Sequence, residues 1–110
     1  FLICLTIFDI KHVEATELKE DKLIESIAKD YTSKFCNSVA FGLSKESAMN
    51  FAFKENILRF KNKKYFDILN KDLIANKIAI SVVEDCGYLV NLKGQQSISD
   101  FENDYLSMNK

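Results

Sequence analysis

Two cysteines, Cys36 and Cys86, are the residues whose chemistry depends most on where the chain places them. The chain has three cysteines, but Cys4 lies in the first fifteen residues, which we expect to be removed on export. The two that remain are an even number, which favours a disulfide in a small exported protein. The alternative is that each is a small buried apolar side chain. A redox-active pair is less favoured, because there is no C-x-x-C spacing and no neighbouring histidine to lower a thiol pKa. We therefore predict a structural disulfide between Cys36 and Cys86.

A second group of residues could bind a partner. Basic side chains interleaved with aromatic ones could bind an acidic partner, an anionic lipid headgroup or single-stranded nucleic acid. The favoured alternative is a solvated helix end whose lysines complement the helix dipole. Two apolar residues of the same region lie opposite its main apolar stripe. A helix with two apolar sides is either central in a bundle or in contact with something outside it. Together these residues form the candidate interaction surface: Phe51, Leu58, Arg59, Lys61, Lys63 and Lys64.

No group of residues has the spacing of a catalytic motif. The acidic clusters at 100–104 and 84–85 could supply a carboxylate pair, but helix-end and surface charge explains them better. The one histidine, His12, excludes a histidine triad or a multi-histidine metal site within one chain. Phosphate-binding glycine loops and the G-x-S-x-G motif are also absent. We expect neither enzymatic activity nor a cofactor or metal.

The composition is that of one small folded domain. Of 110 residues, 47% are hydrophobic, which excludes an intrinsically disordered chain. The 15 basic and 16 acidic residues leave a formal net charge of −1, so no overall field attracts nucleic acid. We therefore expect no nucleic-acid partner. The lack of proline leaves helices uninterrupted.

The first fifteen residues have the pattern of a truncated secretory signal. Phe1–Phe8 is an apolar run too short to span a bilayer, and Val13-Glu14-Ala15 is a small-x-small cleavage pattern. The charged Asp9 and Lys11 near the cleavage site, and Thr6 within the apolar run, argue against a signal; the alternative is a buried strand or the first turns of a helix. We predict a signal-peptide remnant at 1–15 and a single helical domain at 16–110. If residues 1–15 are retained, the protein is cytoplasmic or anchored to a membrane by that segment.

Apolar residues recur at three- and four-residue spacings along the rest of the chain. They predict four helices, at about 17–41, 45–61, 70–86 and 100–108. Thr16 and Ser44 are the expected caps at the start of the first two helices, and Gly42 is the expected stop between them. Ser99 and Glu102 have the spacing of a capping box for the fourth helix.

The predicted fold is all-α, a small up-down bundle of about four helices, with a shorter fourth helix closing it. In an up-down-up arrangement the first and third helices are parallel, so their C-terminal ends lie at the same end of the bundle. That topology brings Cys36 and Cys86 to a similar height, as a disulfide requires.

The segments Ser47–Asn56 and Ile80–Tyr88, together with the Lys, Asn, Ile and Phe usage of an AT-rich genome, carry a resemblance. In these features the chain resembles short uncharacterised exported proteins of marine picocyanobacteria. The resemblance implies a bacterial source and a periplasmic or thylakoid-lumen location. It implies no activity and no functional residue.

Three functions are compatible with these observations. The first is a non-catalytic, exported bundle that binds another protein as an accessory subunit, for which Phe51 and Leu58 are the motivating residues. The second is a small carrier of an apolar ligand, because the nine phenylalanines could line a pocket. An enzyme is the least favoured, because the sequence offers no candidate catalytic pair.

Overall fold

The computed structural model describes the backbone of residues 2–109 and the side chains of residues 18–109. This part contains four α-helices and two short 3₁₀ turns, and it contains no strand. The helices are α1 (Leu2–Ala40), α2 (Lys45–Phe60), α3 (Lys71–Cys86) and α4 (Gly94–Met108); the turns are η1 (Phe66–Ile68) and η2 (Gly87–Leu89). The predicted all-α fold is confirmed.

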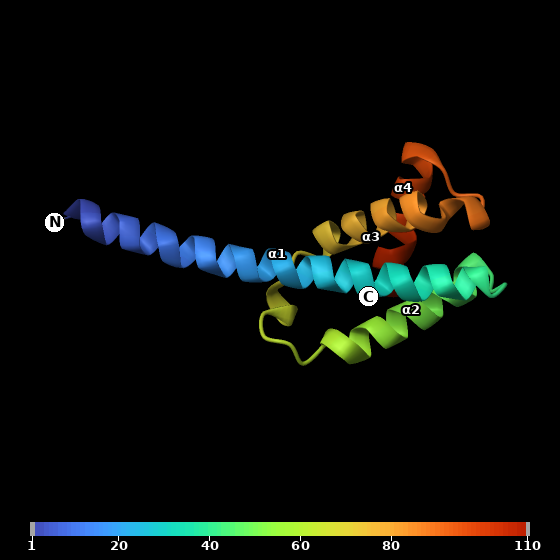
Figure 1. The fold of residues 1–110 in the computed structure, drawn as a ribbon, viewed down its shortest axis with the longest axis horizontal. Coiled ribbons are helices and arrows are strands. Elements are labelled where there is room, and N and C mark those ends of the chain that lie inside the picture. Colours follow the sequence, from blue (N-terminus) through green and yellow to red (C-terminus); the bar gives the residue numbers. More distant parts are fainter. Residues whose placement is uncertain (1, 110) are drawn as a thin grey trace.

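Helix α1 lies between α2 and α3 (Figure 1). The chain returns along α1 in α2, then runs parallel to α1 in α3, on the other side. Helix α4 packs mainly against α3 and crosses it steeply, instead of running alongside it. Its 15 residues make it the shortest of the four helices, as expected, although it is only one residue shorter than α2 and α3.

Local signals correctly define the α1–α2 turn and the start of α2. Gly42, with φ +100°, donates its backbone N–H to Val39 O at 3.0 Å, and Leu43 donates to Ser38 O at 3.1 Å. This pair of bonds is a Schellman motif, which needs a residue that tolerates positive φ. The Ser44 hydroxyl then accepts a hydrogen bond from Ser47 N at 3.2 Å and caps α2.

Two predicted helix starts are wrong. Helix α1 begins at Leu2, so Thr16 lies inside the helix and does not cap it. Helix α4 begins at Gly94, six residues before the predicted Asp100, and Ser99 lies within it. Gly94 has φ +77°, and this turn of the backbone directs the chain straight into α4. No further loop residues lie between Gly94 and the helix. The first turn of α4 is held by the Ser97 hydroxyl, which accepts from Lys93 N at 3.0 Å.

The helical backbone of α1 continues through the cleavage site predicted after Ala15. The signal-peptide interpretation of residues 1–15 concerns side chains outside the described range, and it stays a prediction. Among the described residues, no helix combines the length and apolarity needed to cross a membrane.

The core is organised around aromatic side chains of α1 and α4. Tyr31, Phe35 and Phe101 are completely buried, and Tyr105 is nearly so. The rings of Phe35 and Phe101 meet edge to face, with centroids 5.3 Å apart, and those of Tyr31 and Tyr105 do so at 5.5 Å. Such pairs stabilise a core by about 0.5–1.5 kcal/mol beyond the area that they bury. Aromatic packing thus joins α4 to α1 although α4 mainly contacts α3.

Candidate functional site

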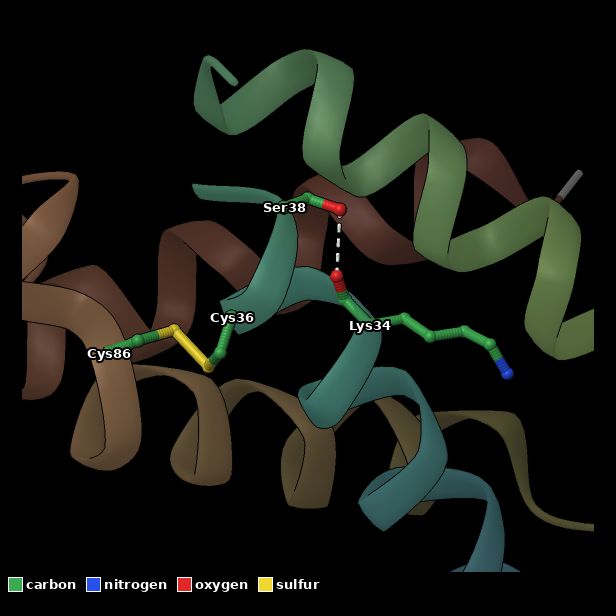
Figure 2. Close-up of a disulfide and its surroundings, with 4 residues drawn as sticks. All are labelled: Lys34, Cys36, Ser38 and Cys86. Atoms are coloured by element: carbon green, nitrogen blue, oxygen red, sulfur yellow. Dashed lines mark hydrogen bonds between the residues drawn. A yellow bond between two sulfur atoms is a disulfide. The ribbon is translucent and has the colours of Figure 1, made fainter. Parts of the chain in front are cut away.

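The structure places Cys36 and Cys86 in a disulfide, as the sequence predicts (Figure 2). Their Cα atoms are 5.7 Å apart, within the usual range for the bond. The bond joins α1, near its C-terminal end, to the last residue of α3. Figure 2 shows Cys36 leaving α1 toward α3, whereas Lys34 and Ser38 point away from the disulfide. The disulfide therefore lies on the side of α1 that faces α3, and the polar side chains of Lys34 and Ser38 lie on another side.

Phe51 and Leu58 are both exposed on α2, with 46% and 61% of their surface accessible. They are seven residues apart and so lie on one side of the helix. Lys54 and Glu55 occupy the turn between them, so these two residues do not form one continuous apolar stripe. Their exposure shows that α2 does not lie at the centre of the bundle, but Leu58 lies apart from Phe51.

Phe51 instead shares a surface with two residues of the α1–α2 turn. Phe41 is 88% exposed and Leu43 is 40% exposed. With Phe51 they line an open groove of about 510 Å³, which we call the apolar groove; Lys34, Asn37 and Ser38 complete it. The sequence interpretation missed Phe41 and Leu43. The available signal was a pair of large apolar residues flanking Gly42, the residue that reverses the chain.

Arg59 is anchored to α1 by Asp30. Its Nη1 donates to Asp30 Oδ1 at 2.7 Å, and Lys34 Nζ donates to the same oxygen at 2.6 Å. The amide of Asn56, a fully buried residue of α2, donates to Asp30 Oδ2 at 2.9 Å and to the backbone oxygen of Ile27 at 3.0 Å. This polar network binds α2 to α1.

The surroundings of Asp30 set its ionisation. Burial by itself raises the pKa of a carboxyl group, since it disfavours the charged form. Here the hydrogen bonds from Lys34, Asn56 and Arg59, together with the charge of Lys34, outweigh burial and hold the pKa of Asp30 below its usual range. Asp30 is therefore charged at neutral pH, and it neutralises part of the positive charge of its partners.

The predicted basic stretch is divided by the fold. Arg59 and Lys63 line an open groove of about 580 Å³, which we call the basic groove. A third cation, Lys29 of α1, also lines this groove, and the sequence interpretation missed it. The other lining residues are Leu23, Ser26, Asp30, Ser33 and Phe60. Lys64 instead lies with its Nζ 5.3 Å from the ring centroid of Tyr65, and Lys61 is exposed outside the residues lining the groove.

The acidic cluster at 100–104 lies inside α4, because this helix begins at Gly94, so its interpretation as helix-end charge is wrong. Two of its carboxylates contact other helices, whereas Glu84 and Asp85 are exposed surface charges. Asp104 of α4 pairs with Lys45 of α2 at 2.8 Å, and Glu102 accepts a hydrogen bond from Asn76 of α3 at 2.6 Å. Burial raises the pKa of Tyr105 to about 12, so its hydroxyl stays protonated at neutral pH.

Within residues 18–109, no three cysteine, histidine or carboxylate side chains lie close enough together to bind a metal.

Comparison of the chain with protein-family models, with curated proteins and with solved structures finds no match. The site must therefore be interpreted from its own geometry, which consists of two neighbouring grooves of opposite character.

Proposed function

We propose that this protein is an exported, non-catalytic helical bundle that binds another protein as an accessory subunit. The observation that carries the proposal is the exposure of Phe41, at 88%, beside Leu43 and Phe51. A single exposed apolar residue needs no explanation, but a contiguous apolar patch marks an interaction site on a soluble protein. Large aromatic side chains are also the residues that contribute most to binding at protein interfaces.

The disulfide supports the export part of the proposal. Such bonds persist in oxidising compartments and are rare in the reducing cytosol. The periplasm and the thylakoid lumen fit this requirement, and they are also the locations that the sequence resemblance implies. Binding a protein is favoured over carrying an apolar ligand, because Phe35 and Phe101 pack against each other in the core instead of lining a pocket.

Site-specific photo-crosslinking in the cells that make the protein tests this proposal. A benzophenone side chain replaces Phe41 in one variant and Tyr88 in a matched control. Tyr88 is 78% exposed and lies in η2, the turn that directly follows α3; α3 itself packs on the side of α1 opposite to α2. We expect irradiation to link one defined protein to position 41 and not to position 88.

Binding of the identified protein is then measured with both components purified. Phe41→Ser should weaken the affinity at least tenfold, whereas Tyr88→Ser should leave it unchanged, because an interface depends on a few buried aromatic side chains. If position 41 yields no protein adduct, or if both positions link the same set of proteins equally, the proposed function is wrong.

A further inference from the structure

The two grooves lie end to end along the boundary between α1 and α2. Residues of α1 that line them recur every three or four positions, and therefore form a single ridge; they are Ser26, Asp30, Ser33, Asn37 and Phe41. Lys34, which lines the apolar groove, also pairs with Asp30, which lines the basic groove. One extended ligand could therefore contact both grooves.

The length of this surface suits a short peptide segment. From Ser26 to Phe41 the ridge measures about 22 Å, at 1.5 Å per helical residue. A helix of about 15 residues, or an extended strand of about 7, covers that distance. The surface therefore matches a single secondary-structure element of a partner.

The charge of the basic groove defines one end of such a segment. Three cations line the groove, from Lys29, Arg59 and Lys63, against one carboxylate, that of Asp30. Asp30 already accepts hydrogen bonds from Lys34, Asn56 and Arg59, so little of its charge is left to balance the others. The Arg59 side chain stays 63% exposed, and its remaining N–H groups are suited to a further carboxylate. An excess of positive charge remains in a chain whose formal net charge is −1.

We infer that the partner presents a segment with large apolar residues at one end and aspartate or glutamate residues at the other. The apolar end covers Phe41, Leu43 and Phe51, and the acidic end enters the groove lined by Lys29, Arg59 and Lys63. This inference rests on the proposed function and specifies the chemistry of the partner.

Two other anionic ligands fit the basic groove less well. A membrane is a broad surface, whereas these cations line a depression between two helices. Single-stranded nucleic acid requires exposed aromatic rings on which bases stack, and Phe60, the aromatic residue of the groove, is 5% exposed. An acidic peptide segment needs neither a flat surface nor a stacking platform.

The test extends the crosslinking to the basic end of the surface. A benzophenone side chain at Ser26 supplements the one at Phe41, both in the full disulfide-bonded chain, and mass spectrometry identifies the peptides linked at each position. We expect both positions to link the same segment of one partner. The residues linked at position 41 should be apolar, and those linked at position 26 should lie next to aspartate or glutamate.

Charge reversal then separates this inference from the proposed function. In Lys29→Glu and Lys63→Glu, capture from position 41 and affinity for the purified partner should each fall about tenfold, and added salt should weaken wild-type binding. The matched control is Lys77→Glu, since Lys77 belongs to α3 and lines neither the basic nor the apolar groove; it should bind as the wild type does. Circular dichroism and the melting temperature verify that each variant is folded.

The possible outcomes point to different conclusions. If position 41 still captures the partner but charge reversal at 29 and 63 has no more effect than at 77, the inference is wrong and the proposed function stands. The same holds if position 26 links a lipid, a nucleic acid or a segment without acidic residues. If position 41 captures nothing, the proposed function fails and the inference with it.

Discussion

The two sides of α1 are held to their neighbours by different means. Toward α3, the Cys36–Cys86 disulfide provides a covalent link. Toward α2, a polar network centred on Asp30 and Asn56 makes the connection. The exposed apolar residues Phe41, Leu43 and Phe51 lie on the α2 side.

This difference has consequences for stability. A disulfide acts mainly by restricting the unfolded chain, so its contribution does not depend on ionisation. The network of Asp30 depends on a charged carboxylate and is therefore sensitive to pH. The contact of α1 with α2 should therefore weaken in acid, as the pH falls through the lowered pKa of Asp30, whereas the link to α3 should not respond to that change.

The largest effect is expected from removing the disulfide. Closing a loop between residues 50 apart stabilises a chain by about 4 kcal/mol in the chain-entropy model, so Cys36→Ala with Cys86→Ala should lose about that much free energy of unfolding. Urea denaturation of the wild type and the double variant, each with and without reductant, measures the loss. Reductant should destabilise the wild type alone; a wild type insensitive to reductant would contradict the role assigned to the bond.

A smaller loss is expected from the network on the other side of α1. Asn56→Ala removes both hydrogen bonds from a fully buried amide and leaves the oxygen of Ile27 without that donor, at a cost of about 2 kcal/mol. Urea denaturation gives the value, and Asn62→Ala, an exposed residue after α2, is the matched control. Equal stability of the two variants would show that the network does not hold α2.

The free energy of unfolding should depend on pH through Asp30, which distinguishes the α1–α2 contact from the disulfide on the other side of α1. Because its folded-state pKa lies below its ordinary value of 3.8, the ionised carboxylate stabilises the fold above about pH 4. That stabilisation is lost as the pH falls through the folded-state pKa. Asp30→Asn should therefore cost about 1–2 kcal/mol at pH 7, and the difference from the wild type should shrink toward pH 2.5.

Denaturation of both proteins at the two pH values measures this change. The difference between wild type and variant isolates Asp30 from the other carboxylates, which titrate in both proteins. A difference that stays constant down to pH 2.5 would mean that the charge of Asp30 does not stabilise the α1–α2 contact.

The smallest effect on stability is expected at the candidate binding residue. Phe41 is 88% exposed, so Phe41→Ser should change the free energy of unfolding by no more than about 0.5 kcal/mol. Thermal or urea denaturation verifies this, and it also makes the binding loss predicted for this variant interpretable. A loss of 2 kcal/mol or more would instead make Phe41 part of the fold.

Much of the fold could be predicted because its signals are local. The Ser44 cap, the Gly42 turn and the limits of α3 each depend on a few neighbouring residues, and each is confirmed. The start of α4 was not predicted, because a glycine with positive φ is compatible with two outcomes: the helix begins at once, or the loop continues for several residues. A backbone angle decides between the two, and the residue type permits both.

The candidate site was predictable only in part. The exposure of Phe51 and Leu58 follows from their position opposite the main apolar stripe of α2. That Phe41 and Leu43 adjoin Phe51 depends on how the turn folds back, and that Lys29 joins Arg59 and Lys63 depends on the packing of α1 against α2. Residues about 30 positions apart carry no common periodicity, so no pattern in the sequence links them.

The sequence by itself determined the helical class and the Ser44 cap of α2, and it favoured the pairing of Cys36 with Cys86. These depend on local backbone preferences, on apolar periodicity and on the parallel direction of two helices. Only the tertiary structure decided that Asp30 binds Arg59 and Asn56, and that an apolar and a basic groove adjoin along α1. The physical reason is that hydrogen bonds and surface charge act over a few ångströms, so their partners are set by the packing of whole helices.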